Sequence, residues 1–252
     1  LGDGTFFGGI AEGEPLNRFY GYVATGIIET EEQAANANYD ALSRLPQKGA
    51  KRVGDYEWAD RNGDGQITTA DQFCLGVTVP PFTGGLQNSF RLKNWTLSLY
   101  LDWATGHSIF DESYSRYFYG TFTNNYALAK DVLKAWKKPG DKTKYAKFYA
   151  NDSNWGNDNY NRSPTNTFTY KGDYLCLREI TLQYSLPSKL FTKVGLKGVT
   201  LTVSGNNLCY LTEVKGISPE TGASTTYEGS GDNAYYNYPP IRRFSFGVRL
   251  IF

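Results

Sequence analysis

Apolar and polar residues alternate strictly along residues 95–103. The apolar positions are Trp95, Leu97, Leu99, Leu101 and Trp103. The positions between them are Thr96, Ser98, Tyr100 and Asp102. Successive side chains of a β-strand point to opposite faces, so this pattern predicts a strand of about nine residues with one apolar face. Lys93 and Asn94 precede it and predict a tight turn, which makes residues 90–103 a candidate hairpin.

Three later segments show the same alternation. They are residues 174–186, 198–208 and 243–252. In the first, Ile180, Leu182 and Tyr184 are in phase, whereas Leu175 and Leu177 fall out of phase. This break requires either a β-bulge or a face that a neighbouring element buries. In the last, every second residue from Phe244 to Phe252 is apolar, and the chain ends on this strand.

The remaining segments predict short helices and long loops. A polar helix is expected from about Glu31, and a second over residues 123–138, ended by Pro139 and Gly140. Residues 151–171 are rich in Asn, Asp, Gly and aromatics and predict a long loop. Another loop of roughly thirty residues separates the last two strands, and loops of that length are usually functional.

Residues 60–71, DRNGDGQITTAD, place oxygen-bearing groups at the spacing of an EF-hand-like loop. Gly65 suits the sharp turn and Ile67 can point inward to hold the loop. The predicted calcium ligands are the side chains of Asp60, Asn62, Asp64 and Asp71 and the main-chain carbonyl of Gln66. No good helix precedes Asp60, which favours a structural ion over a calcium sensor. The alternative is a turn without metal, because Asp, Asn and Gly favour turns in any case.

Composition excludes several classes of function. The formal net charge of the 252 residues is +1, so nothing indicates nucleic acid as a partner. The sequence has no run of eighteen apolar residues, and therefore no transmembrane helix is expected. A single histidine, His107, argues against a Ser-His-Asp triad, and no acid–base pair is marked, so we expect no enzyme. The three cysteines are widely spaced, so they do not indicate a metal site, and their odd number excludes complete pairing in disulfides within the chain.

The alternating strands fit two fold classes, a transmembrane β-barrel and a soluble β-sandwich. Three features favour the barrel. Trp and Tyr lie near the ends of the apolar faces, as in an aromatic girdle. The opposite faces carry Thr, Ser, Gln, Asp and Arg, as a wet lumen would. The final strand ends in Phe252, like the terminal assembly signal of bacterial outer-membrane barrels.

Several motifs resemble SusC-family TonB-dependent transporters of Bacteroidetes. Residues 54–111 are similar to the family's G-D-x-x-x-x-D-x-N-G-D-G-x-I loop and the P-x-F-x-G-G segment after it. GDYLCLREITLQYSLP, VSGNNLCYLTEVKGISPETG and YPPIRRFSFGVRLIF resemble three later motifs, and LNRFYGYVATGI an earlier one. The resemblance covers nearly the whole chain in order. The chain departs from the family at Cys176, where Arg is common, and at Cys209, where an aromatic residue is usual.

The resemblance implies an all-β fold, namely the C-terminal strands of a 22-stranded antiparallel transmembrane β-barrel whose long extracellular loops carry short helices. Residues 1–252 would be the C-terminal part of the transporter, without its plug and N-terminal strands, and residues 60–71 an EF-hand-like loop within it. Calcium would be a structural cofactor there.

The implied function is import of oligosaccharides or peptides across the cell outer membrane. The implied partners are a SusD-like surface lipoprotein, TonB (through the missing N-terminal plug), the remaining N-terminal part of the transporter and lipid. The alternative is a secreted, calcium-dependent β-sandwich binding module. A dockerin-like module would need a second calcium loop, and the sequence has none.

Overall fold

The computed structural model describes residues 12–13, 15, 18–43, 49–119, 129–149, 158–160, 162, 165–190, 195–220 and 240–252. The chain divides into two compact units. The sheet unit consists of Pro80–His107, Lys171–Glu220 and Tyr238–Phe252. The loop unit consists of Leu1–Val79, Ser108–Tyr170 and Thr221–Asn237. Each unit is described separately below.

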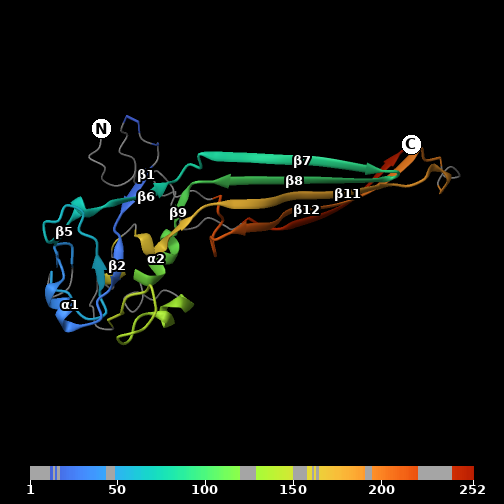
Figure 1. Cartoon of the computed structure of the whole chain (residues 1–252). Helices are drawn as coiled ribbons and strands as arrows, with labels where there is room; N and C mark the ends of the chain where they lie inside the picture. Colours follow the sequence, from blue (N-terminus) through green and yellow to red (C-terminus); the bar gives the residue numbers. More distant parts are fainter. Residues whose placement is uncertain are drawn as a thin grey trace, which may run out of the picture. The chain divides into compact units, whose positions relative to one another are not determined.

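The sheet unit is built on five long antiparallel strands (Figure 1), in the spatial order β13-β12-β11-β8-β7. Their bounds are β7 Phe82–Leu92, β8 Trp95–Thr105, β11 Tyr174–Ser185, β12 Gly198–Thr212 and β13 Arg243–Ile251. A short 3₁₀ helix, η5 (Ser188–Leu190), lies in the connection between β11 and β12. All four long segments predicted as strands are therefore strands, and β7 extends the predicted hairpin.

The predicted hairpin turn is confirmed. Leu92 pairs with Trp95, which leaves Lys93 and Asn94 as the two turn residues. Lys93 has φ 52, the left-handed backbone that a two-residue hairpin turn requires. The Asn94 carbonyl accepts a hydrogen bond of 2.9 Å from the Ser185 amide, which ties the turn to β11.

Residues that pair across the strands share a face, and the register sorts them by polarity. One row of partners consists of Phe90, Leu97, Leu182, Val203 and Phe246. The adjacent row consists of Ser89, Ser98, Thr181, Ser204 and Ser245. Neighbouring rows point to opposite sides of the sheet. The sheet unit therefore has one apolar face and one polar face.

The phase break predicted in residues 174–186 is a β-bulge at Arg178. Leu177 pairs with Leu101 and Glu179 with Tyr100, so Arg178 is an extra residue relative to β8. On β12, Leu177 pairs with Cys209 and Glu179 with Asn206, so that strand carries a further extra residue. The bulge returns Leu175 and Leu177 to the apolar face, where Trp103 and Leu101 are their partners on β8.

The loop unit holds short strands joined by irregular segments. β1 (Arg18–Gly21) pairs with β6 (Phe73–Val77), β2 (Ala24–Ile27) with β4 (Tyr56–Trp58), and β9 (Ser108–Phe110) with β10 (Thr169–Lys171). β3 (Tyr39–Asp40) runs parallel to β5 (Gln66–Ile67). Among the described residues of this unit, the helices are α1 (Glu31–Asn36) and α2 (Glu112–Tyr119), and the 3₁₀ turns are η1 (Thr69–Asp71), η2 (Lys130–Lys134), η3 (Asp158–Tyr160) and η4 (Asn166–Phe168).

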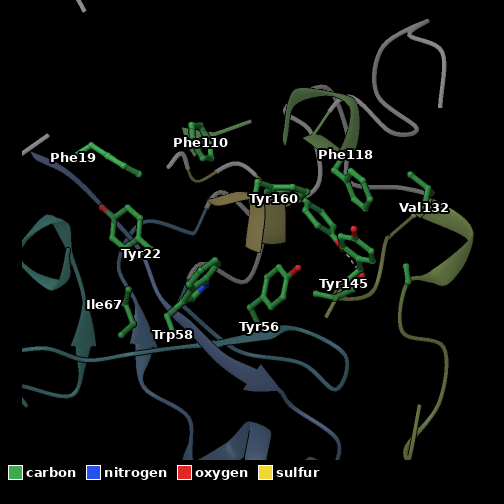
Figure 2. Close-up of a cluster of buried hydrophobic side chains, with 13 residues drawn as sticks. Phe19, Tyr22, Tyr56, Trp58, Ile67, Phe110, Phe118, Val132, Tyr145 and Tyr160 are labelled. Carbon is green, nitrogen blue, oxygen red and sulfur yellow. Dashed lines mark hydrogen bonds between the residues drawn. The ribbon is translucent and has the colours of Figure 1, made fainter. Parts of the chain in front are cut away.

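An aromatic cluster forms the core of the loop unit (Figure 2). Phe118 from α2 is fully buried, with its ring centroid 4.6 Å from Tyr145 and 5.2 Å from Phe168. Tyr160 stacks on Phe148 at 4.6 Å, and its hydroxyl donates to the Ala146 carbonyl at 2.7 Å. Buried tyrosines of this kind satisfy their hydroxyls while their rings fill the core.

The helix predictions had mixed outcomes. The helix expected from Glu31 is α1, and Thr30 caps it by accepting from the Gln33 amide at 3.2 Å. The prediction of a helix over residues 123–138 is wrong for the described part, which contains only the 3₁₀ turn η2; residues 120–128 lie outside the described residues. The Trp136 amide donates instead to the Tyr145 carbonyl at 2.9 Å, a partner outside any helix. No helix in the described part of the chain is long and apolar enough to span a membrane.

Candidate functional site

The EF-hand-like loop follows β4 in the loop unit, contains β5 and η1, and is held at its middle. The Gly65 carbonyl accepts from the Tyr39 amide at 3.0 Å, and Asp40 pairs with Ile67. Ile67 is fully buried in the aromatic core, as the sequence predicted for a residue that pins the loop. Gly63 and Gly65 both have positive φ, which provides the sharp turn.

Three of the predicted ligands accept hydrogen bonds from main-chain amides of the same loop. Asp60 accepts from the Gly63 amide at 2.7 Å and from the Gly65 amide at 2.8 Å. Asn62 accepts from the Asp64 amide at 3.1 Å, and Asp64 from the Gln66 amide at 2.8 Å. The loop is solvent-exposed from Arg61 to Gln66. Its amides therefore hold these side-chain oxygens against the loop, and each oxygen keeps a second lone pair with which it could coordinate an ion.

Asp71, the fourth predicted side-chain ligand, is fully buried. One carboxylate oxygen accepts from the Arg61 amide at 2.9 Å, and the other from the Thr68 amide at 2.7 Å and the Thr68 hydroxyl at 3.1 Å. Burial alone would raise the pKa of this carboxyl, but the amides of Thr68, Arg61 and Asn62 outweigh it and lower the pKa below 3.8. Asp71 thus closes the loop through hydrogen bonds.

The fit of this loop to calcium is partial. The described residues contain no group of three or more His, Cys, Asp or Glu side chains arranged to hold a metal ion. The carboxylates of Asp60, Asp64 and Asp71 therefore do not converge on one point in this structure, and each accepts hydrogen bonds from main-chain amides. Gln66, whose carbonyl was the remaining predicted ligand, lies in β5.

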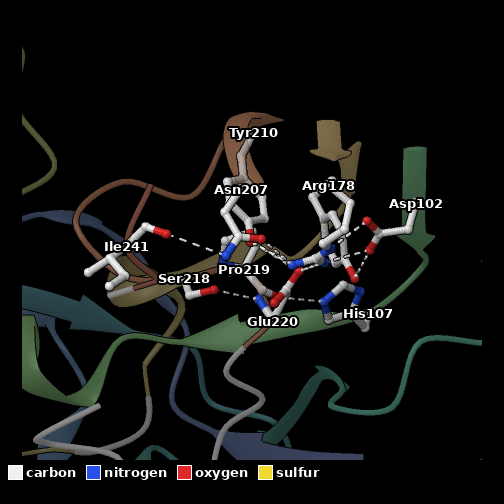
Figure 3. Close-up of polar contacts among 10 residues, drawn as sticks. Asp102, His107, Arg178, Asn207, Tyr210, Ser218, Pro219, Glu220 and Ile241 are labelled. Carbon is white, nitrogen blue, oxygen red and sulfur yellow. Dashed lines mark hydrogen bonds and ion pairs between the residues drawn. The ribbon is translucent and has the colours of Figure 1, made fainter. Parts of the chain in front are cut away.

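A second polar cluster surrounds the bulge residue Arg178 in the sheet unit (Figure 3). Its Nε and Nη2 donate to the two carboxylate oxygens of Asp102 at 2.9 and 2.7 Å. Its Nη1 donates to Asn207 Oδ1 at 2.9 Å and to the Tyr210 hydroxyl at 3.2 Å. Nη2 also pairs with Glu220. Arg178 therefore joins β8, β12 and the segment after β12.

The segment after β12 contacts the sheet unit through Pro219 and Glu220, and Ser218 braces Glu220 from within the segment. Ser218 Oγ accepts from the Glu220 amide at 3.2 Å, and the Tyr210 hydroxyl donates to Glu220 at 3.1 Å. The Pro219 carbonyl lies 3.3 Å from Nε2 of the buried His107. A carbonyl only accepts, so this contact requires the proton on Nε2. The sequence analysis missed this cluster; its only signal was the phase break around Arg178.

The apolar face of the sheet unit is exposed. Its exposed side chains are Phe82, Leu86, Phe90, Leu92, Trp95, Trp103, Leu175, Leu182, Leu201, Val203, Leu211, Phe244, Phe246, Val248 and Leu250. Phe246 in the edge strand β13 is 81% exposed. Soluble monomers rarely expose contiguous apolar surface beyond a few hundred Å². The extent of this apolar surface therefore indicates that it contacts lipid or another protein surface rather than water.

Comparison with known proteins decides what kind of chain this is. The chain is 29% identical over 252 residues to TonB-dependent receptor P3 of Formosa agariphila, a match covering 96% of this chain and 23% of that protein. It is 30% identical to TonB-dependent receptor P39 of the same organism, with 87% of this chain and 24% of that protein covered. The chain is related to TonB-dependent receptors. It spans about a quarter of the length of these curated relatives.

Solved structures show the same fold. The chain matches the structure of the RagAB peptide transporter with a TM-score of 0.60 at 21% identity, over 93% of this chain and 23% of that one. It matches the RagAB peptide importer in the open-open state with a TM-score of 0.61 at 20% identity, over 100% of this chain and 25% of that one. No family model matches the chain. The resemblance to TonB-dependent receptors is confirmed, and so is the all-β fold class; the relatives are named receptors and transporters, which fits the expectation of no enzyme.

Proposed function

We propose that this chain forms part of the transmembrane barrel of a TonB-dependent importer in the cell outer membrane. The observation that carries the proposal is the exposed apolar face of the sheet unit, backed by a polar face on the same strands. Strands of an outer-membrane barrel present apolar residues to lipid and polar residues to the lumen. The relatedness to TonB-dependent receptors supports the same assignment.

The substrate we propose is a peptide or an oligosaccharide. The structural neighbours are titled a peptide transporter and a peptide importer, which supports a peptide. The resemblance to the SusC family supports an oligosaccharide equally well. We propose that a SusD-like surface lipoprotein and TonB are the partners, and that the remaining strands of a 22-stranded barrel and its plug belong to the same transporter.

We also propose that residues 60–71 bind one structural calcium ion in an extracellular loop. The alternating oxygens of Asp60, Asn62 and Asp64 and the turn at Gly65 support it. The carboxylates of Asp60 and Asp64 accept from the amides of Gly63, Gly65 and Gln66 and keep further lone pairs for the ion.

The membrane assignment is tested by arginine substitutions on the two faces of β8. Leu99 and Ser98 are neighbours near the middle of the strand, and their side chains point to opposite faces. Leu99→Arg should destabilise the assembled transporter by about 2–4 kcal/mol, the cost of Arg on the lipid face near the bilayer midplane. Ser98→Arg, facing the lumen, is the matched control.

The readout is reversible unfolding of the complete transporter in lipid bilayers by denaturant, followed by tryptophan fluorescence. A large loss of unfolding free energy with Leu99→Arg and a small loss with Ser98→Arg would support the barrel. Equal losses from both substitutions, or a larger loss from Ser98→Arg, would show that lipid does not cover the apolar face.

A further inference from the structure

At one end of the sheet unit, all the charged residues that the structure describes are basic. It is the end with the β7–β8 turn and the connection from β11 to β12, called here the turn end. Its exposed cations are Lys93, Lys189, Lys197 and Arg249. Arg91 is exposed one row inside it, paired with Thr96. No ion pair joins any of these five side chains to an acidic residue of the described chain.

The sequence leaves no acidic residue to balance them. Residues 80–101, 180–212 and 233–252 contain no Asp or Glu. The opposite end of the same sheet is mixed, since Arg178 there contacts Asp102 and Glu220, and Asp173 and Glu213 are nearby in the chain. Solvated protein surfaces usually intersperse both signs of charge. The single sign at the turn end therefore indicates a negatively charged neighbour.

The register places the turn end just beyond the last aromatic row of the apolar face. The last aromatic pair of that face is Trp95 on β8 and Tyr184 on β11, which are paired and have ring centroids 4.4 Å apart. Lys93 lies in the turn directly before Trp95. Arg249 pairs with Thr200, one residue beyond the partner that Tyr184 has on β12, Leu201, and it therefore lies on the polar face at the level of the turn. Aromatic rings at the edge of an apolar band mark the depth of lipid headgroups.

We propose that the turn end of the sheet binds the headgroup phosphates of anionic phospholipids, in the bilayer leaflet that faces this end. The proposal rests on the proposed function, because it requires the apolar face to lie in lipid. Long Lys and Arg side chains can leave their aliphatic stems along the apolar edge and extend their charges to phosphate. Phosphatidylglycerol should be preferred over phosphatidylcholine, since only the former carries net charge.

The test measures which lipid contacts Trp95 in the complete transporter. The protein is reconstituted in bilayers containing phosphatidylglycerol or phosphatidylcholine with brominated acyl chains, which quench nearby tryptophan. The Trp95 signal is the difference between the protein and its Trp95→Phe variant. We expect a relative binding constant near Trp95 at least about fivefold higher for phosphatidylglycerol, the effect of one basic residue near a charged membrane.

Two charge variants complete the design. K93Q/K189Q/K197Q/R249Q removes the four exposed cations of the turn end that lie in the described part of the chain and should abolish the preference. K171Q/K215Q/R242Q/R243Q removes four exposed cations toward the other end and should retain it. Equal quenching by the two lipids in the unsubstituted protein, or an equal loss of preference in both variants, overturns the proposal. Absence of Trp95 quenching by either lipid would instead contradict the membrane assignment itself, so the two failures are distinguishable.

Discussion

Asp71 belongs to the loop that the sequence marks for calcium, yet its carboxylate caps η1 and closes the loop through protein hydrogen bonds. It accepts from Arg61 at one end and Thr68 at the other, and it is fully buried. The spacing of residues 60–71 identified Asp71 as a source of ligand oxygens. It could not specify which groups would hydrogen-bond to those oxygens. Main-chain amides compete for the same oxygens as a metal, and only the folded backbone decides that competition.

Acid should loosen this loop through Asp71. Its pKa is lowered on folding, so its ionised form stabilises the loop above the ordinary value of 3.8, and this contribution is lost as the pH falls below it. Hydrogen exchange of residues 60–71, corrected for intrinsic pH dependence, should rise as the pH falls from neutral to below that value. Asp71→Asn should raise exchange at neutral pH and flatten its pH dependence. A loop whose protection is unchanged in the variant would contradict this role.

Calcium binding is a separate prediction for the exposed half of the loop. Titration calorimetry of the complete transporter should show one site with a dissociation constant of roughly 10⁻⁴–10⁻³ M, the range of extracellular calcium modules. The double variant D60N/D64N removes two carboxylates from the loop and should remove the heat of binding. Magnesium is the control ion, because its smaller octahedral shell suits this loop poorly. Binding unaffected by D60N/D64N would show that any calcium site lies elsewhere.

At the scale of elements, the Arg178 cluster fastens the segment 218–220 to the sheet. Arg178→Gln should weaken the attachment of this segment by about 1.5–3 kcal/mol, the usual value for hydrogen bonds to charged groups. It also takes the Arg178 contacts from Asp102, whose carboxylate then keeps the Tyr174 hydroxyl at 3.4 Å. Glu220→Gln should cost less, since Arg178 keeps Asp102, Asn207 and Tyr210.

Hydrogen exchange of residues 213–220 measures both effects locally. The double variant R178Q/E220Q should cost less than the sum of the single variants, because the two side chains share one contact. Arg243→Gln, which alters an exposed arginine of the same unit, is the control and should leave the segment unchanged. Strictly additive costs would show that the Arg178–Glu220 contact contributes nothing.

Sequence patterns identified the long strands because alternation is a local signal with a fixed period. They also located the phase break between Leu177 and Ile180, which left a bulge and a buried face as alternatives, and the structure shows a bulge. They missed α2 and the pairing of β1 with β6, which depend on contacts between distant residues. The helix over residues 123–138 was predicted from local periodicity, whereas Trp136 takes its hydrogen-bond partner from Tyr145. Arg178 escaped notice because a bulge residue belongs to neither face of the alternation.

At the scale of the whole molecule, the sheet has two edges that the described residues leave unpaired, β7 and β13. The smallest transmembrane barrels have about eight strands, more than the five present in this sheet. Open strand edges in lipid carry unsatisfied amides and carbonyls. In the proposed barrel the number of strands would depend on parts of the protein outside these 252 residues, so sequence patterns within them could not define it.

Expression of these 252 residues alone in detergent should therefore give aggregate. Size-exclusion chromatography with light scattering is the measurement. The complete transporter prepared in the same detergent is the control and should be monodisperse. A folded, monodisperse species of the mass of one chain would contradict the open sheet and favour a small closed barrel.

The bulge at Arg178 has one more consequence, which concerns insertions and deletions. It acts as a phase marker, because residues on its two sides use opposite parities to reach the same face: odd numbers before it and even numbers after it. Removing that single residue would act on the strand as a frameshift acts on a reading frame. Leu175 and Leu177 would exchange sides with Tyr174 and Cys176. The part of β11 before the bulge would then direct its apolar side chains to the polar face, while the part after the bulge kept its orientation.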